Sequence, residues 1–177
     1  MAMCNDSPTF KVHDDYYTPK SAWENINHLI PKDKVILEGC MLNSDKSKSP
    51  DYLTELGNKV VYDRTLNFIT DDIPECDMII TNPPFKTDIK KQILTRLVEI
   101  DKPFIIVMNC MNTFTKYIRE IFKGNLEHLQ IITPSGKINF DRLDYDTNEL
   151  IPTKKCSFYC IYLCYKMELK PEDLWLD

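Results

Sequence analysis

Short apolar runs rich in β-branched residues alternate with amphipathic segments along most of this chain, and this alternation restricts the possible folds more than any other feature. The runs that we interpret as strands are 34–39, 60–63, 77–81, 104–108 and 128–133. The segments between them that we interpret as helices are 19–30, 49–56, 88–100 and 113–122. Strands that alternate with helices indicate a mostly parallel sheet that is covered by helices on both faces.

The C-terminal part of the chain departs from this alternation. Residues 157–165 form a long strand candidate that follows 138–140 without a clear helix, so we expect an antiparallel hairpin there. The 177 residues fit one domain, and no repeat, low-complexity tract or linker divides them. The sequence therefore predicts a single domain over residues 1–177, a three-layer Rossmann-like α/β sandwich without a separate target-recognition domain.

Two of the expected helices begin with the same local signal. Thr18 precedes Pro19 and Ser49 precedes Pro50, so each proline would occupy the first helical position behind a residue type that caps helices. We therefore expect Thr18 and Ser49 to be N-caps. Gly57 is expected just past the end of the second helix, where glycine is favoured.

Glycine is scarce, and this excludes some classes of enzyme. The chain has four glycines and eleven prolines, and neither G-x-G-x-x-G nor G-x-x-x-x-G-K-[ST] occurs, which argues against dinucleotide-binding dehydrogenases and P-loop enzymes. The net charge of −5 provides no overall attraction to nucleic acid, so a polyanion would need a local basic patch. The side chains that form either such a phosphate-contacting rim or an ordinary solvated surface are Lys86, Lys90, Lys91, Lys137, Arg142, Lys154 and Lys155.

The cysteines and the N-terminal residues bear on location. Seven cysteines, an odd number, suit a reducing compartment better than a disulfide scaffold. No basic region followed by an apolar run begins the chain, and no stretch approaches the ~20 apolar residues that span a bilayer, so we expect a cytoplasmic protein without a membrane partner. Cys156, Cys160 and Cys164 would share one buried strand face, and neither they nor the three histidines have the spacing of a metal site.

Polar residues follow four of the expected strands at the point where each strand ends. Ligands of open parallel sheets bind beyond the carboxyl ends of the strands, near the position where the strand order reverses. The segments at these ends are 38–40, 63, 82–85 and 109–112. We therefore expect the functional site to be built from these segments.

The sequence Asn82-Pro83-Pro84-Phe85 has the chemistry needed to orient an amine. An aromatic exocyclic amine is a poor nucleophile, because its lone pair is delocalised into the ring. Two acceptors placed against its N–H bonds, the Asn82 side-chain oxygen and the Pro83 carbonyl, would turn the lone pair toward an electrophile. Two prolines in succession would hold these acceptors stiffly, and Phe85 offers a flat face on which a base or amide can stack.

With the apolar strand before it, Thr81-Asn82-Pro83-Pro84-Phe85 resembles motif IV, [DNS]-P-P-[YFW], of class I S-adenosylmethionine-dependent amino-methyltransferases, most closely the N6-adenine branch. Asp15-Tyr16-Tyr17-Thr18-Pro19 resembles the F/Y-Y-T-P element that precedes the first helix in many of these enzymes. The segment 139–142 is similar to the one ahead of the terminal strands in small viral and phage-type adenine methyltransferases. The resemblance covers nearly the whole chain and implies the Rossmann-like methyltransferase fold with S-adenosylmethionine as cofactor.

The resemblance also implies a set of cofactor-binding residues. These are Tyr17, Thr18, Pro19, Glu38, Gly39, Cys40, Asp63, Asn67 and Phe68. In this family Glu38 would pair with the methionine ammonium, Asp63 would bind the ribose, and Asn67 and Phe68 would lie beside the adenine. One departure concerns motif I, usually acid-x-x-x-G-x-G, which here holds Gly39 alone; side chains of 43, 44 or 47 would then replace backbone donors.

The sequence therefore predicts an enzyme that methylates the N6 amine of adenine in DNA, with Asn82, Pro83, Pro84 and Phe85 as its catalytic motif. Nucleic acid is the expected partner, DNA before RNA. Three alternatives share the same motif or fold: methylation of adenine in RNA, methylation of a protein amide, and a catalytically inactive partner subunit of another methyltransferase. Any sequence specificity would come from short loops such as 141–152 or from a partner subunit.

Overall fold

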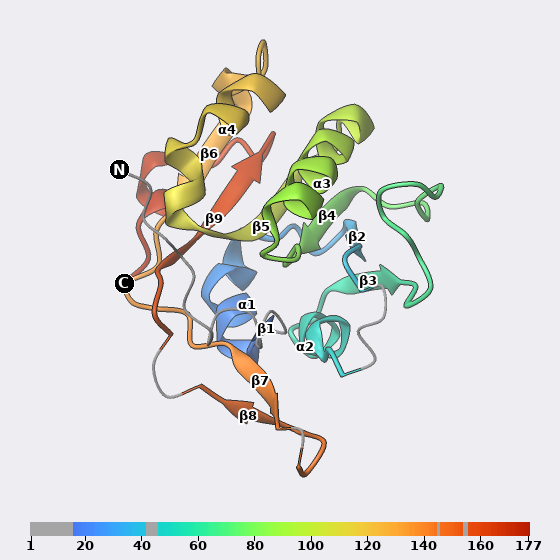
Figure 1. Ribbon diagram of the computed structural model, residues 1–177. Coiled ribbons are helices and arrows are strands. Elements are labelled where there is room, and N and C mark those ends of the chain that lie inside the picture. The colour runs from blue at the N-terminus through green and yellow to red at the C-terminus, as the bar shows by residue number, and fades with distance from the viewer. Residues whose placement is uncertain (1–15, 42–45, 145, 154–155) are drawn as a thin grey trace.

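A six-stranded sheet forms the centre of the computed structural model, which describes residues 16–41, 46–144, 146–153 and 156–177. Its strands lie in the order β3 (Lys59–Tyr62), β2 (Val35–Glu38), β4 (Met78–Thr81), β5 (Phe104–Asn109), β9 (Cys160–Tyr165) and β6 (Leu129–Ile132) (Figure 1). The first four strands are parallel, and β9 is antiparallel to both β5 and β6. The predicted mostly parallel sheet with an antiparallel C-terminal hairpin is therefore confirmed.

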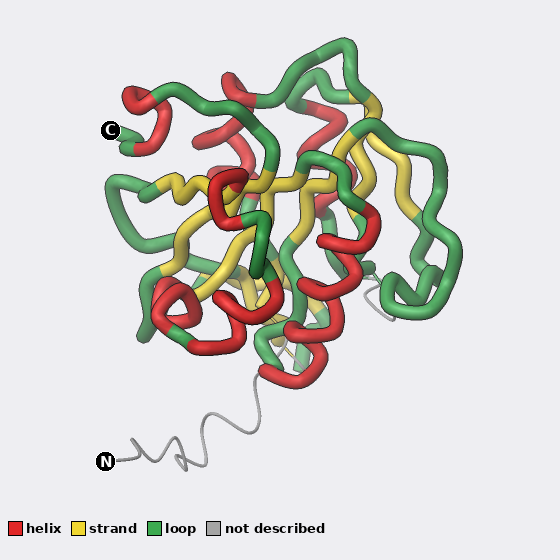
Figure 2. Tube along the Cα trace, turned by 90° about the horizontal axis from the view of Figure 1, so that it is seen from above, coloured by secondary structure: helices red, strands yellow, loops and turns green. Residues whose placement is uncertain are grey.

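Helices cover both faces of this sheet. The helices are α1 (Lys20–Ile26), α2 (Ser49–Glu55), α3 (Thr87–Ile100) and α4 (Lys116–Ile121), and short 3₁₀ helices are η2 (Asn27–Leu29), η3 (Cys110–Phe114), η4 (Leu126–His128) and η5 (Pro171–Leu174). Side chains of α1 and α2 pack on one face, and those of α3 and α4 pack on the other, which gives three layers (Figures 1 and 2). The three-layer Rossmann-like architecture follows from this arrangement.

The period of two along each strand distributes the apolar side chains between the two faces. In β9, Cys160, Tyr162 and Cys164 face α1, whereas Ile161 and Leu163 face α3 and α4. Because both faces are covered, every residue of β9 is buried. The buried cysteine face predicted from even spacing is confirmed, and its apolar surroundings raise the pKa of the Cys164 thiol to about 12.

A small second sheet lies at the side of the molecule that holds α1 and α2 (Figure 1). It consists of β1 (Tyr16–Tyr17), β7 (Asp141–Asp144) and β8 (Glu149–Pro152). The strands β7 and β8 form an antiparallel hairpin, and β1 pairs with β7 through Tyr16 opposite Arg142. This pairing fixes the backbone of Tyr16, which contacts the Asn82 motif described below.

Several helix boundaries differ from the prediction. The N-cap of α1 is Pro19 rather than Thr18, and Ser49 is the first residue of α2, with Lys48 at the cap position. The Ser49 hydroxyl is used elsewhere, because it donates to the buried Glu38 carboxylate at 2.6 Å. The expected helix 113–122 is split, since Thr115 has an extended backbone between η3 and α4. Gly57 follows α2 with φ of 85°, as its predicted position requires.

Candidate active site

The carboxyl ends of β3, β2, β4 and β5 lie next to one another, so the predicted polar segments meet at one edge of the sheet. A threonine connects two of these ends. The Thr81 hydroxyl, at the end of β4, donates to the Glu38 carboxylate and accepts from the Cys40 backbone N–H at 3.1 Å. The exits of β2 and β4 are thereby held in register around the Asn82 motif.

Glu38 is a buried carboxyl group whose oxygens are bonded within the protein. The residue is 2% exposed, and its carboxylate accepts from the Ser49 hydroxyl, the Thr81 hydroxyl and, at 3.4 Å, the Cys40 amide. Burial raises the pKa of Glu38 to about 7, although these three hydrogen bonds lower it. A carboxyl group that titrates near neutrality can change charge when a cation approaches.

Gly39 and Phe68 define one side of a cavity of about 410 Å³, which we call the Phe68 cavity. Its lining residues are Gly39, Cys40, Leu66, Asn67, Phe68, Ile69, Pro84, Ile89, Gln92 and Ile93. Four residues that the sequence assigned to the cofactor, Gly39, Cys40, Asn67 and Phe68, are therefore brought together, and Pro84 of the motif 82–85 lines the same cavity. The volume is within the range of small-molecule sites, ~300 to 1,000 Å³.

The Phe68 ring lies so close to Gly39 that no larger residue fits there. A Cβ atom on Gly39 would be 2.7 Å from Cδ2 and 2.8 Å from Cε2 of this buried ring. We therefore expect Gly39→Ala to displace Phe68, to lower the free energy of unfolding by about 1 to 3 kcal/mol and to distort the cavity. Thermal unfolding and calorimetric titration with S-adenosylmethionine would measure the two effects.

Gly136 provides the matched control, because a Cβ atom there meets nothing within 4 Å. Gly136→Ala should leave stability and ligand binding unchanged. Trimming the ring in the double variant Gly39→Ala, Phe68→Leu should recover part of the lost stability. Equal melting temperatures for the Gly39→Ala and Gly136→Ala proteins would show that the Phe68 contact does not restrict position 39.

Asn82, at the exit of β4, has a buried acceptor without a partner among the described residues. Its Nδ2 donates to the Tyr16 carbonyl at 3.4 Å, whereas Oδ1 is inaccessible to solvent and accepts no hydrogen bond. The opposite amide orientation would place an oxygen against the Tyr16 carbonyl, so the observed orientation is the favourable one. An unsatisfied buried acceptor costs about 1 to 3 kcal/mol, so such a group calls for an explanation.

Phe85 belongs to a cluster of four aromatic rings. It contacts Tyr16 at 5.5 Å, Phe140 at 5.6 Å and Phe158 at 5.2 Å between ring centroids. These rings come from β1, from the segment ahead of β7 and from the segment ahead of β9. Phe85 therefore already has three aromatic neighbours.

A cleft of about 430 Å³ opens beside this cluster, and we call it the Phe85 cleft. Its lining residues are Tyr16, Phe85, Lys86, Thr87, Lys90, Asn109, Met111, Asn112, Thr115 and Phe158. The first turns of α3 separate it from the Phe68 cavity, since Lys86 and Lys90 line the cleft and Ile89 and Ile93 line the cavity. Pro84 therefore lines the Phe68 cavity, and the next residue of the motif, Phe85, lines the Phe85 cleft.

Lys90 was expected at the surface, but it is only 3% exposed. Its ammonium group donates to Asn112 Oδ1 at 3.3 Å and lies 5.6 Å from the centroid of the Phe85 ring. The sequence spacing predicts the burial of Lys90, because this residue lies three and four residues before the buried Ile93 and Leu94 and so shares their face of α3. A cation therefore borders the cleft from inside the protein.

Other predicted cofactor residues lie outside the Phe68 cavity. Asp63 is exposed after β3, where the Thr65 hydroxyl and amide bind its Oδ1 and hold the pKa of its carboxyl group below the usual value. Tyr17, Thr18 and Pro19 line neither the cavity nor the cleft, and their segment reaches the motif through Tyr16 instead. Four predicted residues lie outside the described part of the chain: the side-chain donors 43 and 44, and residues 154 and 155 of the predicted phosphate-contacting surface.

Neither a metal-binding cluster nor a membrane-spanning helix is found among the described residues. Within 16–41, 46–144, 146–153 and 156–177, no three histidine, cysteine, aspartate or glutamate side chains are grouped to hold a metal ion. No helix in that part of the chain has the length and apolar character needed to cross a membrane.

No family model and no curated protein sequence matches this chain. Among solved structures, similarity is found to TehB from Haemophilus influenzae (12% identity, TM-score 0.45, 84% of this chain and 62% of that one) and to a dimethyladenosine transferase from Plasmodium falciparum (11%, 0.41, 85% and 62%). A TehB-like S-adenosylmethionine-dependent methyltransferase from Corynebacterium glutamicum has 14% identity and a TM-score of 0.37 over 85% of this chain and 88% of that one. The chain thus spans less than two thirds of the length of the first two. Because these identities and TM-scores are low, the reactions named for those proteins are not assigned to this chain.

Proposed function

We propose that this protein transfers a methyl group from S-adenosylmethionine to the exocyclic N6 of adenine in DNA. The observation that carries this proposal is the buried Oδ1 of Asn82, which has no hydrogen-bond partner among the described residues. It lies at the exit of β4, two residues before Pro84, which lines the Phe68 cavity, and three residues before Phe85, which lines the Phe85 cleft. An acceptor in a motif that reaches both a cofactor cavity and a base cleft is suited to orient an amine for transfer.

The Phe68 cavity is the proposed cofactor site. Leu66, Phe68 and Ile69 provide apolar surface for a planar adenine, and Asn67 with the Gly39–Cys40 backbone provides polar groups. Bound S-adenosylmethionine supplies an electrophilic methyl group on a sulfonium. Glu38 directly precedes Gly39, which lines this cavity. Its carboxyl group, in the charged form, would attract the cofactor ammonium.

The Phe85 cleft is the proposed site of the target base. Asn82 Oδ1 and the Pro83 carbonyl would accept the two N–H bonds of the amine and direct its lone pair at the methyl carbon. The nitrogen–carbon bond forms while the carbon–sulfur bond breaks, and the resulting cationic amine then releases a proton to water, so no strong general base is required. Because Oδ1 is buried, Tyr16 or a neighbouring ring has to move before the base can reach it.

One set of contacts supports a second candidate, a catalytically inactive partner subunit. The Glu38 carboxylate is already bonded to Ser49 and Thr81, and the Phe68 ring covers Gly39, the one glycine of this loop. A cofactor-binding loop normally leaves its backbone N–H groups accessible. Calorimetric titration of the folded protein with S-adenosylmethionine separates the two candidates, because the inactive subunit would give no heat of binding.

Incubation with tritiated cofactor and a panel of DNA, RNA and protein acceptors tests the reaction and its acceptor together. We expect label in adenine-containing DNA, recovered as N6-methyladenine after digestion. Label confined to RNA or to a glutamine amide would support the proposed transfer chemistry but assign a different substrate. No label in any acceptor, with the cofactor bound, would contradict the proposal.

A further inference from the structure

Three large, exposed apolar side chains belong to segments that line the Phe85 cleft, because Met111 lines it and the other two directly adjoin the lining residues Thr115 and Phe158. Met111, Phe114 and Tyr159 are 66%, 76% and 59% exposed, and we call them the aromatic rim. They are three of the seven large hydrophobic side chains that are exposed in the described part of the chain, although they occupy only two short segments. Single exposed apolar residues need no explanation, whereas a group of them marks an interaction site.

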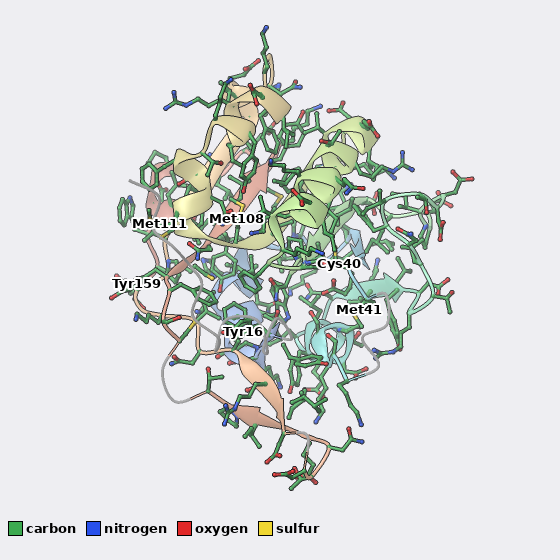
Figure 3. The ribbon with its side chains drawn as sticks, in the orientation of Figure 1. Tyr16, Cys40, Met41, Met108, Met111 and Tyr159 are labelled. Carbon is green, nitrogen blue, oxygen red and sulfur yellow. The ribbon has the colours of Figure 1, made fainter. Side chains whose placement is uncertain are left out.

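Backbone geometry places the two segments of the rim side by side. Asn109, at the end of β5, pairs with Cys160, at the start of β9, and the Cys110 N–H donates to the Tyr159 carbonyl at 3.0 Å. Met111 and Tyr159 consequently lie on the same side of the molecule (Figure 3). Phe114 follows Met111 by three residues in the 3₁₀ helix η3, and side chains at this spacing lie above one another.

Alternation along the segment ahead of β9 connects the rim to the interior of the cleft. Phe158 points inward and contacts Phe85, whereas the next residue, Tyr159, is exposed. Met111 itself lines the cleft. The apolar surface therefore continues from the exposed rim into the cleft where the target base is proposed to bind.

Three lysines border this surface, although the whole chain has a net charge of −5. Lys86 and Lys90 line the cleft, and no carboxylate is among the lining residues that the structure describes. The Lys137 ammonium lies 4.6 Å from the centroid of the Tyr159 ring and is held there by the Cys156 carbonyl at 3.0 Å. Aromatic side chains combined with lysines are the features that bind unpaired nucleotide strands.

We propose that the aromatic rim binds an unpaired nucleotide strand, with bases stacked on Tyr159 and Phe114 and phosphates beside Lys86 and Lys137. This inference rests on the proposed function for the identity of the base that enters the cleft, but strand binding itself requires neither cofactor nor catalysis. A paired duplex cannot offer its base faces to the rim, so single-stranded acceptors bind more tightly than duplexes of the same sequence.

Fluorescence anisotropy with a labelled oligodeoxyadenylate, without cofactor, tests this proposal. Tyr159→Ala is expected to weaken binding by about tenfold to a hundredfold, the effect of losing one stacked base. Tyr159→Phe keeps the ring and should bind as the wild type does. Tyr62→Ala is the matched control, since Tyr62 is another exposed tyrosine beside a cation, Arg64, on the far edge strand β3.

The charged part of the surface is tested by salt dependence. The logarithm of the binding constant should fall linearly with the logarithm of salt concentration, and Lys86→Gln should reduce this slope by about one if Lys86 contacts one phosphate. An oligoriboadenylate measured in parallel shows whether the strand is recognised as DNA or through chemistry that both nucleic acids share.

Three outcomes would overturn the proposal: equal binding by Tyr159→Ala and wild type, equal affinity for duplex and single strand, or self-association that depends on Tyr159 without oligonucleotide binding. Its failure is distinguishable from failure of the proposed function. Tyr159-dependent strand binding without label transfer to any acceptor would refute the methyltransferase assignment alone. Label transfer to DNA with unaltered binding by Tyr159→Ala would refute the strand-binding role of the aromatic rim alone.

Discussion

Methyl transfer is expected to fall by about 10²- to 10³-fold when Asn82 is replaced by alanine, the loss typical of removing one preorganised polar contact to a reacting group. The side-chain oxygen of Asn82 has no partner among the described residues, so its proposed role is to accept a hydrogen bond from the substrate amine. Binding of S-adenosylmethionine, measured by calorimetry, should remain, because Asn82 does not line the Phe68 cavity.

The melting temperature of Asn82→Ala provides the control for folding. Alanine removes an unsatisfied buried acceptor together with a weak 3.4 Å hydrogen bond to Tyr16, so these two effects on stability oppose each other. Asn82→Asp retains an acceptor oxygen and should keep more activity than Asn82→Ala. Full activity in a folded Asn82→Ala protein would refute the role given to this residue.

The stability of the protein is expected to fall as the pH rises through the range from about 4.5 to 7, because of Glu38. Its pKa is raised by burial from 4.5 to about 7, so between these values the folded state binds a proton that the unfolded state has lost. Above pH 7 the shift corresponds to about 3 kcal/mol of lost stability. Glu38→Gln cannot titrate and should exceed the wild type by about 6 to 12 °C in melting temperature at pH 8.

The difference between wild type and Glu38→Gln is the measured quantity, because other groups titrate in both proteins. Thr81 and Ser49 hydroxyls can both donate and accept, so they can rotate to suit the amide. A temperature difference that does not change between pH 5 and pH 8 would show that Glu38 does not titrate in this range. If Glu38 also binds the cofactor ammonium, wild-type affinity should rise from pH 6 to pH 8, and Glu38→Gln should lose this rise.

Local signals made much of the fold predictable. Short β-branched runs that end at acids, glycines or prolines predict the strands. The two prolines of 82–85 predict the end of a strand there, because proline cannot continue a sheet. The buried cysteine face of β9 followed from its period of two. These features depend on neighbours within a few residues, and such information is present in the sequence itself.

Long-range contacts were not predictable in the same way. Ser49 looks like a helix cap by local rules, but its hydroxyl bonds to Glu38 because α2 packs against the exit of β2. Tyr16, Phe140 and Phe158 surround Phe85 only because two sheets bring their segments together. Asp63 follows a strand as a ribose-binding acid would, but it lies outside the Phe68 cavity and bonds to Thr65.

The position of β9 makes the proposed site depend on one late pairing. β9 is inserted between β5 and β6, which precede it in the chain and do not pair directly with each other. Until β9 is in place, the edge of β5 is open, and Phe158, which precedes β9 and lines the Phe85 cleft, is not yet held beside Phe85. The cleft is therefore complete only after the chain has returned to the middle of its own sheet.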